Sequence, residues 1–204
     1  MAQYNQEIAV NSKLLITILF VSAGAAGCSE NSTTLKTADD NHQDQDHTNH
    51  KESPGVIEAP VAPSAEGEKF VLHAEPEEVK TVIAVRQSAK DEEDVTLVGK
   101  IGGSKNPWVE GRAAFTLVDE SLKSCDQIPG DTCPVPWDYC CETHKLKDAS
   151  ALIKIVDEDG QPIKTDARDL LGVRELTHVI VKGKARRDSA GNLTVLASGV
   201  FVKK

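Results

Sequence analysis

Hydrophobic and polar residues alternate along the C-terminal part of the chain in the pattern of β-strands that bury one face. Five runs rich in β-branched residues, bounded by Gly, Asp or Asn, fit this pattern. We expect strands at Val95–Ile101, Ala113–Asp119, Ala151–Asp157, Thr177–Ala185 and Leu193–Val202. Turn residues lie between the third and fourth runs at Glu158–Gly160 and between the fourth and fifth at Ala190–Asn192. The pattern therefore predicts a mainly β domain.

Two segments have helical features. Residues 76–90 place apolar side chains at helical spacing after a proline and two acidic residues, which predicts a short helix ending near Lys90. A strand over Val82–Val85 is the alternative, because β-branched residues dominate there. Asp166–Gly172 predicts a second helix, with a capping carboxylate at its start and a glycine at its end.

Five strands, a helix between the third and the fourth, and glycines where strands bend describe a five-stranded OB-fold-like barrel. Three segments resemble the first, second and fourth strands of that superfold: Val95–Gly103, Ala113–Asp119 and Val179–Ala185. The predicted helix before Asp94–Ile101 resembles the start of the bacterial periplasmic OB-fold family.

Other segments are similar to an uncharacterised group of lipoproteins from planctomycete-like bacteria: Gly99–Gly103, Phe115–Asp119 and Pro136–Cys141. The resemblance covers residues 76–204 and implies a fold but no single ligand, since OB-folds bind oligonucleotides, sugars, proteins or small molecules.

The charge is divided unevenly along the chain. Residues 1–93 carry seven Lys and Arg against sixteen Asp and Glu, whereas residues 94–204 carry sixteen of each. A neutral domain lacks the basic surface that a phosphate backbone requires, so nucleic acid is an unlikely partner.

The N-terminus has the features of a bacterial lipoprotein signal peptide, residues 1–27. Lys13 precedes the apolar run Leu14–Ala23, which is too short to span a bilayer, and Ala25–Cys28 resembles a lipobox. We expect Cys28 to be acylated and to anchor the protein in the bacterial envelope, facing the periplasm. Ser29 favours the outer membrane over the inner. The alternative is an ordinary signal peptide, with Cys28 incidental.

Residues 28–75 are expected to form a disordered acidic linker, rich in polar residues and then in proline. His42, His47 and His50 lie among carboxylates, which leaves weak metal buffering as an alternative to a simple spacer. The folded domain is expected to comprise residues 76–204.

The second and third predicted strands are separated by an insertion, residues 120–150, that holds four of the five cysteines. In an oxidising compartment they predict two disulfides, with Cys125 and Cys133 each joined to one of the adjacent Cys140 and Cys141. A metal site for zinc or copper is the alternative, with His144 as a further ligand. A thiol redox site is a third reading, although no Cys-x-x-Cys motif supports it.

Four aromatic residues could stack on a ligand at the barrel face: Trp108, Phe115, Trp137 and Tyr139. Trp137 could instead pack over a disulfide and close one end of the barrel. Motifs of catalytic nucleophiles, phosphate loops and zinc peptidases are absent from the sequence. The sequence thus predicts a lipid-anchored, non-enzymatic binding domain without a cofactor, whose partner is a protein or small ligand. An envelope metal-binding protein and a single-strand nucleic-acid binder are the alternatives.

Overall fold

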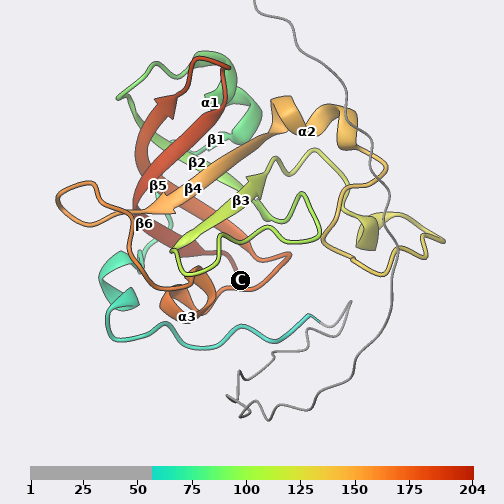
Figure 1. Ribbon diagram of the computed structural model, residues 1–204, viewed down its shortest axis with the longest axis horizontal. Coiled ribbons are helices and arrows are strands. Elements are labelled where there is room, and N and C mark those ends of the chain that lie inside the picture. Colours follow the sequence, from blue (N-terminus) through green and yellow to red (C-terminus); the bar gives the residue numbers. More distant parts are fainter. Residues whose placement is uncertain (1–56) are drawn as a thin grey trace, which may run out of the picture. The chain divides into compact units, whose positions relative to one another are not determined.

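The computed structural model describes residues 57–204, which form mainly β structure (Figure 1). This part of the chain has one six-stranded sheet: β1 Lys80–Thr81, β2 Asp94–Ile101, β3 Ala114–Val118, β4 Ser150–Ile155, β5 His178–Arg187 and β6 Leu193–Val202. Three short α-helices accompany it: α1 Val82–Ser88, α2 Thr143–Ala149 and α3 Ala167–Leu171. Two 3-10 turns are also present: η1 Gly67–Phe70 and η2 Cys125–Gln127. Every predicted strand is found within two residues of its expected ends.

The alternating pattern produces the expected core. In β4, Ala151, Ile153 and Ile155 are buried, whereas the residues between them are partly exposed. Full burial of an isoleucine side chain such as Ile153 contributes about 1.5–3 kcal/mol, because its apolar surface leaves water. The inward residues of β2 to β6 form one continuous apolar cluster, which also includes residues of α1 and α3.

The strand pairings form a circuit that starts and ends at β2, but the strands do not form a regular barrel. β2 pairs with β3, β3 with β4, β4 in parallel with β6, β6 with β5, and β5 with β2. β5 covers one edge of β2 over seven residue pairs. The other edge is shared, because β1 takes Leu97 and Val98 and leaves only two pairs for β3. The prediction of a regular five-stranded barrel is therefore corrected to a six-stranded sheet, in which β1 occupies part of the edge of β2 that β3 also uses.

The first helix is shorter than predicted, and the strand alternative at Val82–Val85 is wrong. Thr81 ends β1 and caps α1, since its hydroxyl accepts a hydrogen bond from the amide of Ala84 at 3.2 Å. Val82 and Val85 are fully buried on one helical face.

The helix α3 forms as predicted. Its N-cap Asp166 accepts a hydrogen bond from the amide of Arg168 at 2.9 Å. Gly172 ends it with a φ of 69°, in the left-handed region that favours glycine. Figure 1 shows α1 and α3 at opposite ends of the strands, with the insertion, in yellow, to one side.

The linker prediction does not hold for residues 61–72. The amide of Val61 donates to the carbonyl of Gly172 at 3.1 Å, and that of Leu72 donates to the carbonyl of Val200 at 2.8 Å. A Cβ on Gly172 would lie 2.0 Å from the Val61 oxygen, so the close approach requires glycine. These contacts and the packing of Phe70 on the core offset the entropy of ordering the segment.

The signal peptide, the acylated Cys28 and the first part of the linker lie outside the described residues.

Candidate metal centre

The insertion between β3 and β4 is ordered by a small core of its own. Val118, Leu122, Tyr139 and Ala149 are buried together, and Ile83 and Leu146 pack against them. The sequence predicts no helix in this segment, yet α2 forms the last part of the insertion. This core orders the insertion by apolar packing.

A buried lysine holds the turn that carries Cys125. The Lys100 side chain leaves β2, and its ammonium group donates to Ser124 Oγ at 2.9 Å and to Gln127 Oε1 at 2.8 Å. Ser124 and Gln127 are the two ends of the capping box around η2. Burial lowers the pKa of Lys100 below its usual value, although the charges of Asp126 and Glu120 oppose that effect. Lys100 thus ties the Cys125 turn to the sheet.

Backbone hydrogen bonds bring Cys140 beside Cys125. The amide of Cys125 donates to the carbonyl of Asp138 at 2.9 Å, and the next amide, of Asp126, donates to Pro136 at 3.0 Å. The same segment is fastened to the end of β2, because the amide of Gly103 donates to the Trp137 carbonyl at 3.2 Å. The segment before Cys140 therefore runs alongside η2.

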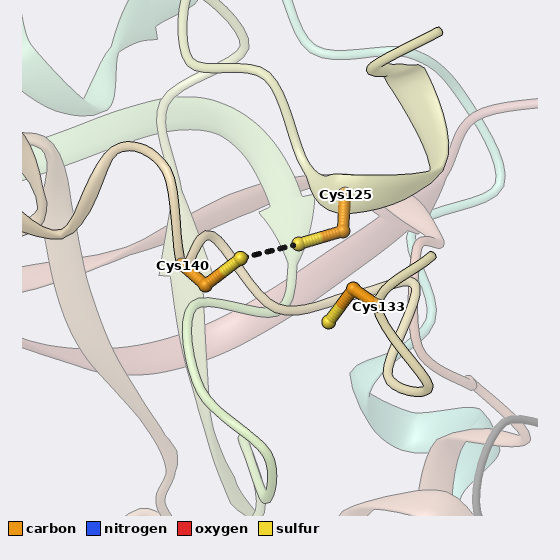
Figure 2. A group of neighbouring side chains, drawn as sticks. All are labelled: Cys125, Cys133 and Cys140. Atoms are coloured by element: carbon orange, nitrogen blue, oxygen red, sulfur yellow. Dashed lines mark hydrogen bonds between the residues drawn. The ribbon is translucent and has the colours of Figure 1, made fainter. Parts of the chain in front are cut away.

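Three cysteine sulfurs meet at this place. The Sγ atoms of Cys125 and Cys140 lie 3.3 Å apart, and those of Cys125, Cys133 and Cys140 all lie within 4.8 Å of one another. Figure 2 shows the Cys125 and Cys140 side chains pointing toward each other, with the Cys133 sulfur beside them. We call Cys125, Cys133 and Cys140 the inner trio.

A second group shares one member with the first. Ligand atoms of Asp131, Cys140 and Cys141 also lie within 4.8 Å of one another, and the Cys140 and Cys141 sulfurs are 3.9 Å apart. Asp131 is held by its own turn, since Oδ1 accepts a hydrogen bond from the Cys133 amide at 2.9 Å. We call Asp131, Cys140 and Cys141 the outer trio, because all three are exposed.

Exposure differs across the cluster. Cys125 is buried, with 4% of its surface exposed, Cys133 is intermediate, and Cys140 and Cys141 are exposed. Burial raises the pKa of the Cys125 thiol well above its usual range. Hydrogen bonding with Cys140 raises the pKa of Cys141. A metal ion bound here would displace protons from these thiols.

The predicted disulfides are not present in the described part of the chain. All four cysteines of the insertion are free thiols, and the nearest pair is separated by 3.3 Å rather than by a bond. Cys133 instead directs its sulfur at the Val135 carbonyl, at 3.4 Å.

His144 does not join the cysteines. Within residues 57–204 neither trio includes it, and it lies on α2 at a hollow of about 660 Å³ that Arg86 and Lys145 also line. The apolar face of α2, with Leu146 and Ala149, packs on the insertion core, so His144 faces a different surface from the sulfurs.

Three of the four aromatic candidates are core residues, which corrects their predicted role in ligand stacking. Phe115 and Tyr139 have no exposed surface, and Trp108 has 6%. Burial raises the pKa of Tyr139 to about 12, so its phenol stays neutral. Trp108 contacts the edge of Phe115, with 5.9 Å between the ring centroids.

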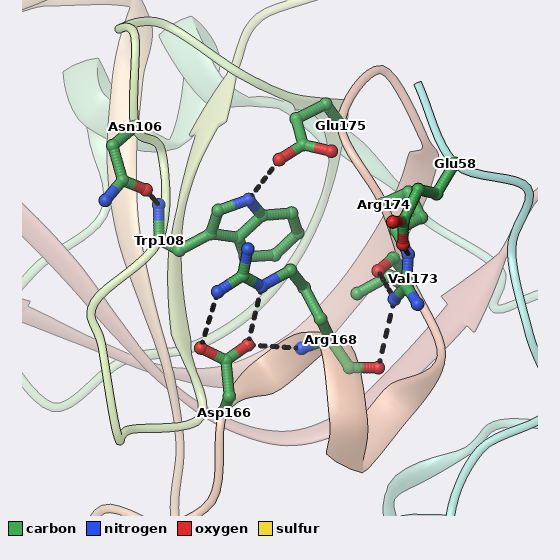
Figure 3. Close-up of polar contacts among 8 residues, drawn as sticks. All are labelled: Glu58, Asn106, Trp108, Asp166, Arg168, Val173, Arg174 and Glu175. Atoms are coloured by element: carbon green, nitrogen blue, oxygen red, sulfur yellow. Dashed lines mark hydrogen bonds and ion pairs between the residues drawn. The ribbon is translucent and has the colours of Figure 1, made fainter. Parts of the chain in front are cut away.

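Polar groups seal the remaining face of Trp108 (Figure 3). The Arg168 guanidinium lies 5.5 Å from its ring centroid and forms a bidentate ion pair with Asp166. The indole nitrogen donates to Glu175. This face of Trp108 is therefore covered by the protein itself.

Trp137 differs from the other three. It is only partly buried, and its indole nitrogen donates to the carbonyl of Lys105 at 3.1 Å. Of the four aromatic candidates it alone keeps appreciable surface, and it lies three residues before Cys140.

Sequence reasoning missed two residues of this centre. Asp131 could have been noted as a carboxylate two residues before Cys133. Nothing in the sequence marks Lys100 as a buried residue, because a lysine between apolar residues of a β-strand ordinarily faces solvent.

No family model matches the chain, and none of the curated proteins compared with it is similar enough to indicate a relationship. Among the described residues, the helices are all too short to cross a bilayer.

Proposed function

We propose that this protein binds a soft metal ion, zinc or copper(I), through the sulfurs of the inner trio. The observation that carries the proposal is the convergence of Cys125, Cys133 and Cys140 within 4.8 Å. Sulfur ligands at about 2.3 Å from a tetrahedral zinc ion are separated by about 3.8 Å. Within the inner trio, the Cys125 and Cys140 sulfurs are 3.3 Å apart, somewhat closer than that value, and all three sulfurs lie within 4.8 Å of one another.

The donor set supports this class of metal. Thiolates select zinc and copper(I), whereas magnesium and calcium require oxygen ligands. Three protein sulfurs leave a fourth position for water or a partner's ligand.

The scaffold also supports binding. The Lys100 contacts and the backbone bonds of Cys125 and Asp126 hold two of the three sulfurs without a metal. Less ordering entropy is then lost when an ion binds.

The strand order supports an OB-fold relationship for the domain. The pairings pass from β2 through β3, β4, β6 and β5 back to β2, β4 and β6 are parallel, and α3 lies between β4 and β5. With the lipobox-like Ala25–Cys28, we infer an envelope protein anchored by acylated Cys28 and facing the periplasm, in the outer membrane by its Ser29. The proposed role is binding rather than catalysis.

Among the alternative functions, ligand stacking on an aromatic residue is left with a single surface. The buried states of Trp108, Phe115 and Tyr139 disfavour a stacked ligand or single-stranded nucleic acid at those residues. A protein or small ligand would have to use Trp137 beside the metal centre.

Metal titration of the reduced full chain tests the proposal. Cobalt(II), a spectroscopic substitute for zinc, should develop thiolate-to-metal absorption at one ion per chain. Ser substitution of Cys125, Cys133 or Cys140 should weaken binding by at least tenfold, while His144→Ala, the matched control, should bind like the wild type. Absence of thiolate-bound cobalt, zinc and copper(I) would contradict the proposal.

A further inference from the structure

The two trios share Cys140, and this sharing suggests how an ion reaches a partly buried site. The outer trio is exposed throughout, whereas the inner trio runs from exposed Cys140 through Cys133 to buried Cys125. An ion from solvent therefore meets Asp131, Cys140 and Cys141 before it meets Cys125.

We propose that the outer trio is a capture site from which the ion passes to the inner trio while Cys140 remains bound. This inference rests on the proposed function of the inner trio. It adds a second, transient position for the ion and assigns roles to Asp131 and Cys141.

The distances make the transfer short. Each position places the ion about 2.3 Å from the Cys140 sulfur, so the two positions are at most about 4.6 Å apart. The Cys140 sulfur is 3.9 Å from Cys141 on one side and 3.3 Å from Cys125 on the other. A short movement of the ion around the Cys140 sulfur is therefore enough to exchange its other ligands.

The chemistry is ligand exchange without a change of oxidation state. The bonds from the ion to the Cys141 sulfur and the Asp131 carboxylate break, and bonds to the Cys125 and Cys133 sulfurs form. The thiol protons of Cys125 and Cys133 pass to water as these bonds form, and Cys141 regains a proton. The inner position has one more sulfur ligand, which favours a soft ion there.

The charge of Asp131 suits the first step. Its carboxylate is exposed and attracts a cation, yet the Cys133 amide holds Oδ1 in place at 2.9 Å. An oxygen ligand is also the weaker one for a soft metal, so it can be released during transfer.

Stopped-flow mixing of cobalt(II) with the reduced, metal-free full chain tests this inference. Every protein carries Cys28→Ser, so that only the thiols of the insertion absorb. The expected wild-type trace has a fast phase and a slower phase that reaches the final thiolate absorption. Cys141→Ser and Asp131→Asn should each reach the final thiolate absorption roughly tenfold more slowly, since residues beside a metal ligand act on this scale. The final spectrum of both variants should equal that of the wild type.

Two variants complete the design. Asp131→Asn keeps an oxygen for the Cys133 amide, so it removes charge without removing that contact. Cys133→Ser should keep the fast phase and lose the final spectrum.

The outcomes separate the two proposals. If the wild type binds no cobalt through thiolates, the proposed function fails. If it binds but Cys141→Ser follows the wild-type rate, the capture site is overturned. A changed final spectrum in Cys141→Ser also overturns it, because Cys141 would then be a permanent ligand.

Discussion

The ammonium group of Lys100 in β2 donates a hydrogen bond of 2.9 Å to the hydroxyl of Ser124, the residue immediately before Cys125. A side chain from the sheet thus holds the turn that presents the most buried sulfur. The contact spans 24 residues of sequence and joins the core of the domain to its insertion.

Replacement of Lys100 should loosen the metal centre more than the fold. Lys100→Met keeps the apolar stem but leaves Ser124 and Gln127 without their buried donor, at a cost of about 1–3 kcal/mol. We expect faster hydrogen exchange at the amides of Cys125 and Asp126, and metal affinity lower by about 10–100-fold. Lys182→Met, at an exposed position of β5, is the matched control. Unchanged exchange at Cys125 would refute the positioning role of Lys100.

Asp119 should be important for attaching α1 to the sheet. Its carboxylate accepts hydrogen bonds from the amide of Ile83 at 2.8 Å and from the amide of Ser121 at 3.0 Å, and the residue is only 2% exposed. Asp119→Ala leaves both amides without this acceptor, and we expect a loss of about 1–3 kcal/mol in the free energy of unfolding. Urea denaturation at neutral pH measures it, and Asp188→Ala, in an exposed turn, gives the comparison.

The same carboxylate should make stability depend on pH. Burial alone would raise the pKa of Asp119, but the hydrogen bonds from Ile83, Ser121 and Thr81 outweigh it and hold the pKa below its usual 3.8. A depressed carboxyl pKa stabilises the fold above that value, and the contribution is lost as the pH falls below it. The stability difference between wild type and Asp119→Asn should therefore shrink on acidification below pH 3.8. A constant difference between neutral and acidic pH would argue against this account.

Oxidation should join Cys125 and Cys140 before any other pair. Their sulfurs are 3.3 Å apart, compared with 3.9 Å for the adjacent Cys140 and Cys141, whose direct bond would be strained. Mild treatment with a disulfide oxidant such as oxidised glutathione, followed by peptide mass mapping, should recover this pair first. Bound zinc should protect both thiols. Early recovery of a Cys133–Cys141 bond would show that the resting arrangement does not direct oxidation.

The two tryptophans should respond differently to truncation. Trp108→Ala removes a core side chain packed on Phe115 and Arg168, and we expect a loss of about 3–5 kcal/mol. Trp137→Ala removes a partly buried ring and one hydrogen bond to Lys105, so the loss should be nearer 1 kcal/mol. Thermal unfolding of both variants compares them, and equal losses would contradict the assignment of Trp108 to the core.

The local pattern of hydrophobic and turn residues was enough to predict most strands of the sheet. β6 begins and ends where the alternation of Leu193–Val202 predicted, and α3 has the Asp166 cap and Gly172 terminus expected of it. The pattern misjudged Val61–Leu72, because the polar, proline-containing stretch before this segment is typical of a linker, and only the tertiary structure shows that α3 and β6 supply partners for its backbone.

The sequence predicted which cysteines form the candidate site, but not how they are arranged in space. The four cysteines marked the insertion, yet sequence alone could not separate two disulfides from a metal site or exclude His144. Nor could it identify Trp108 and Tyr139 as buried, since aromatic residues serve cores and ligand surfaces alike.

The sequence by itself therefore determined which segments become strands and where the thiols are concentrated, because periodicity and turn residues act over a few neighbouring positions. Only the tertiary structure decided that Cys125, Cys133 and Cys140 meet, that Asp131 and Cys141 adjoin them, and that Lys100 supports them. Those contacts join residues that are separated along the chain, and their geometry depends on how the insertion packs against β2 and β3.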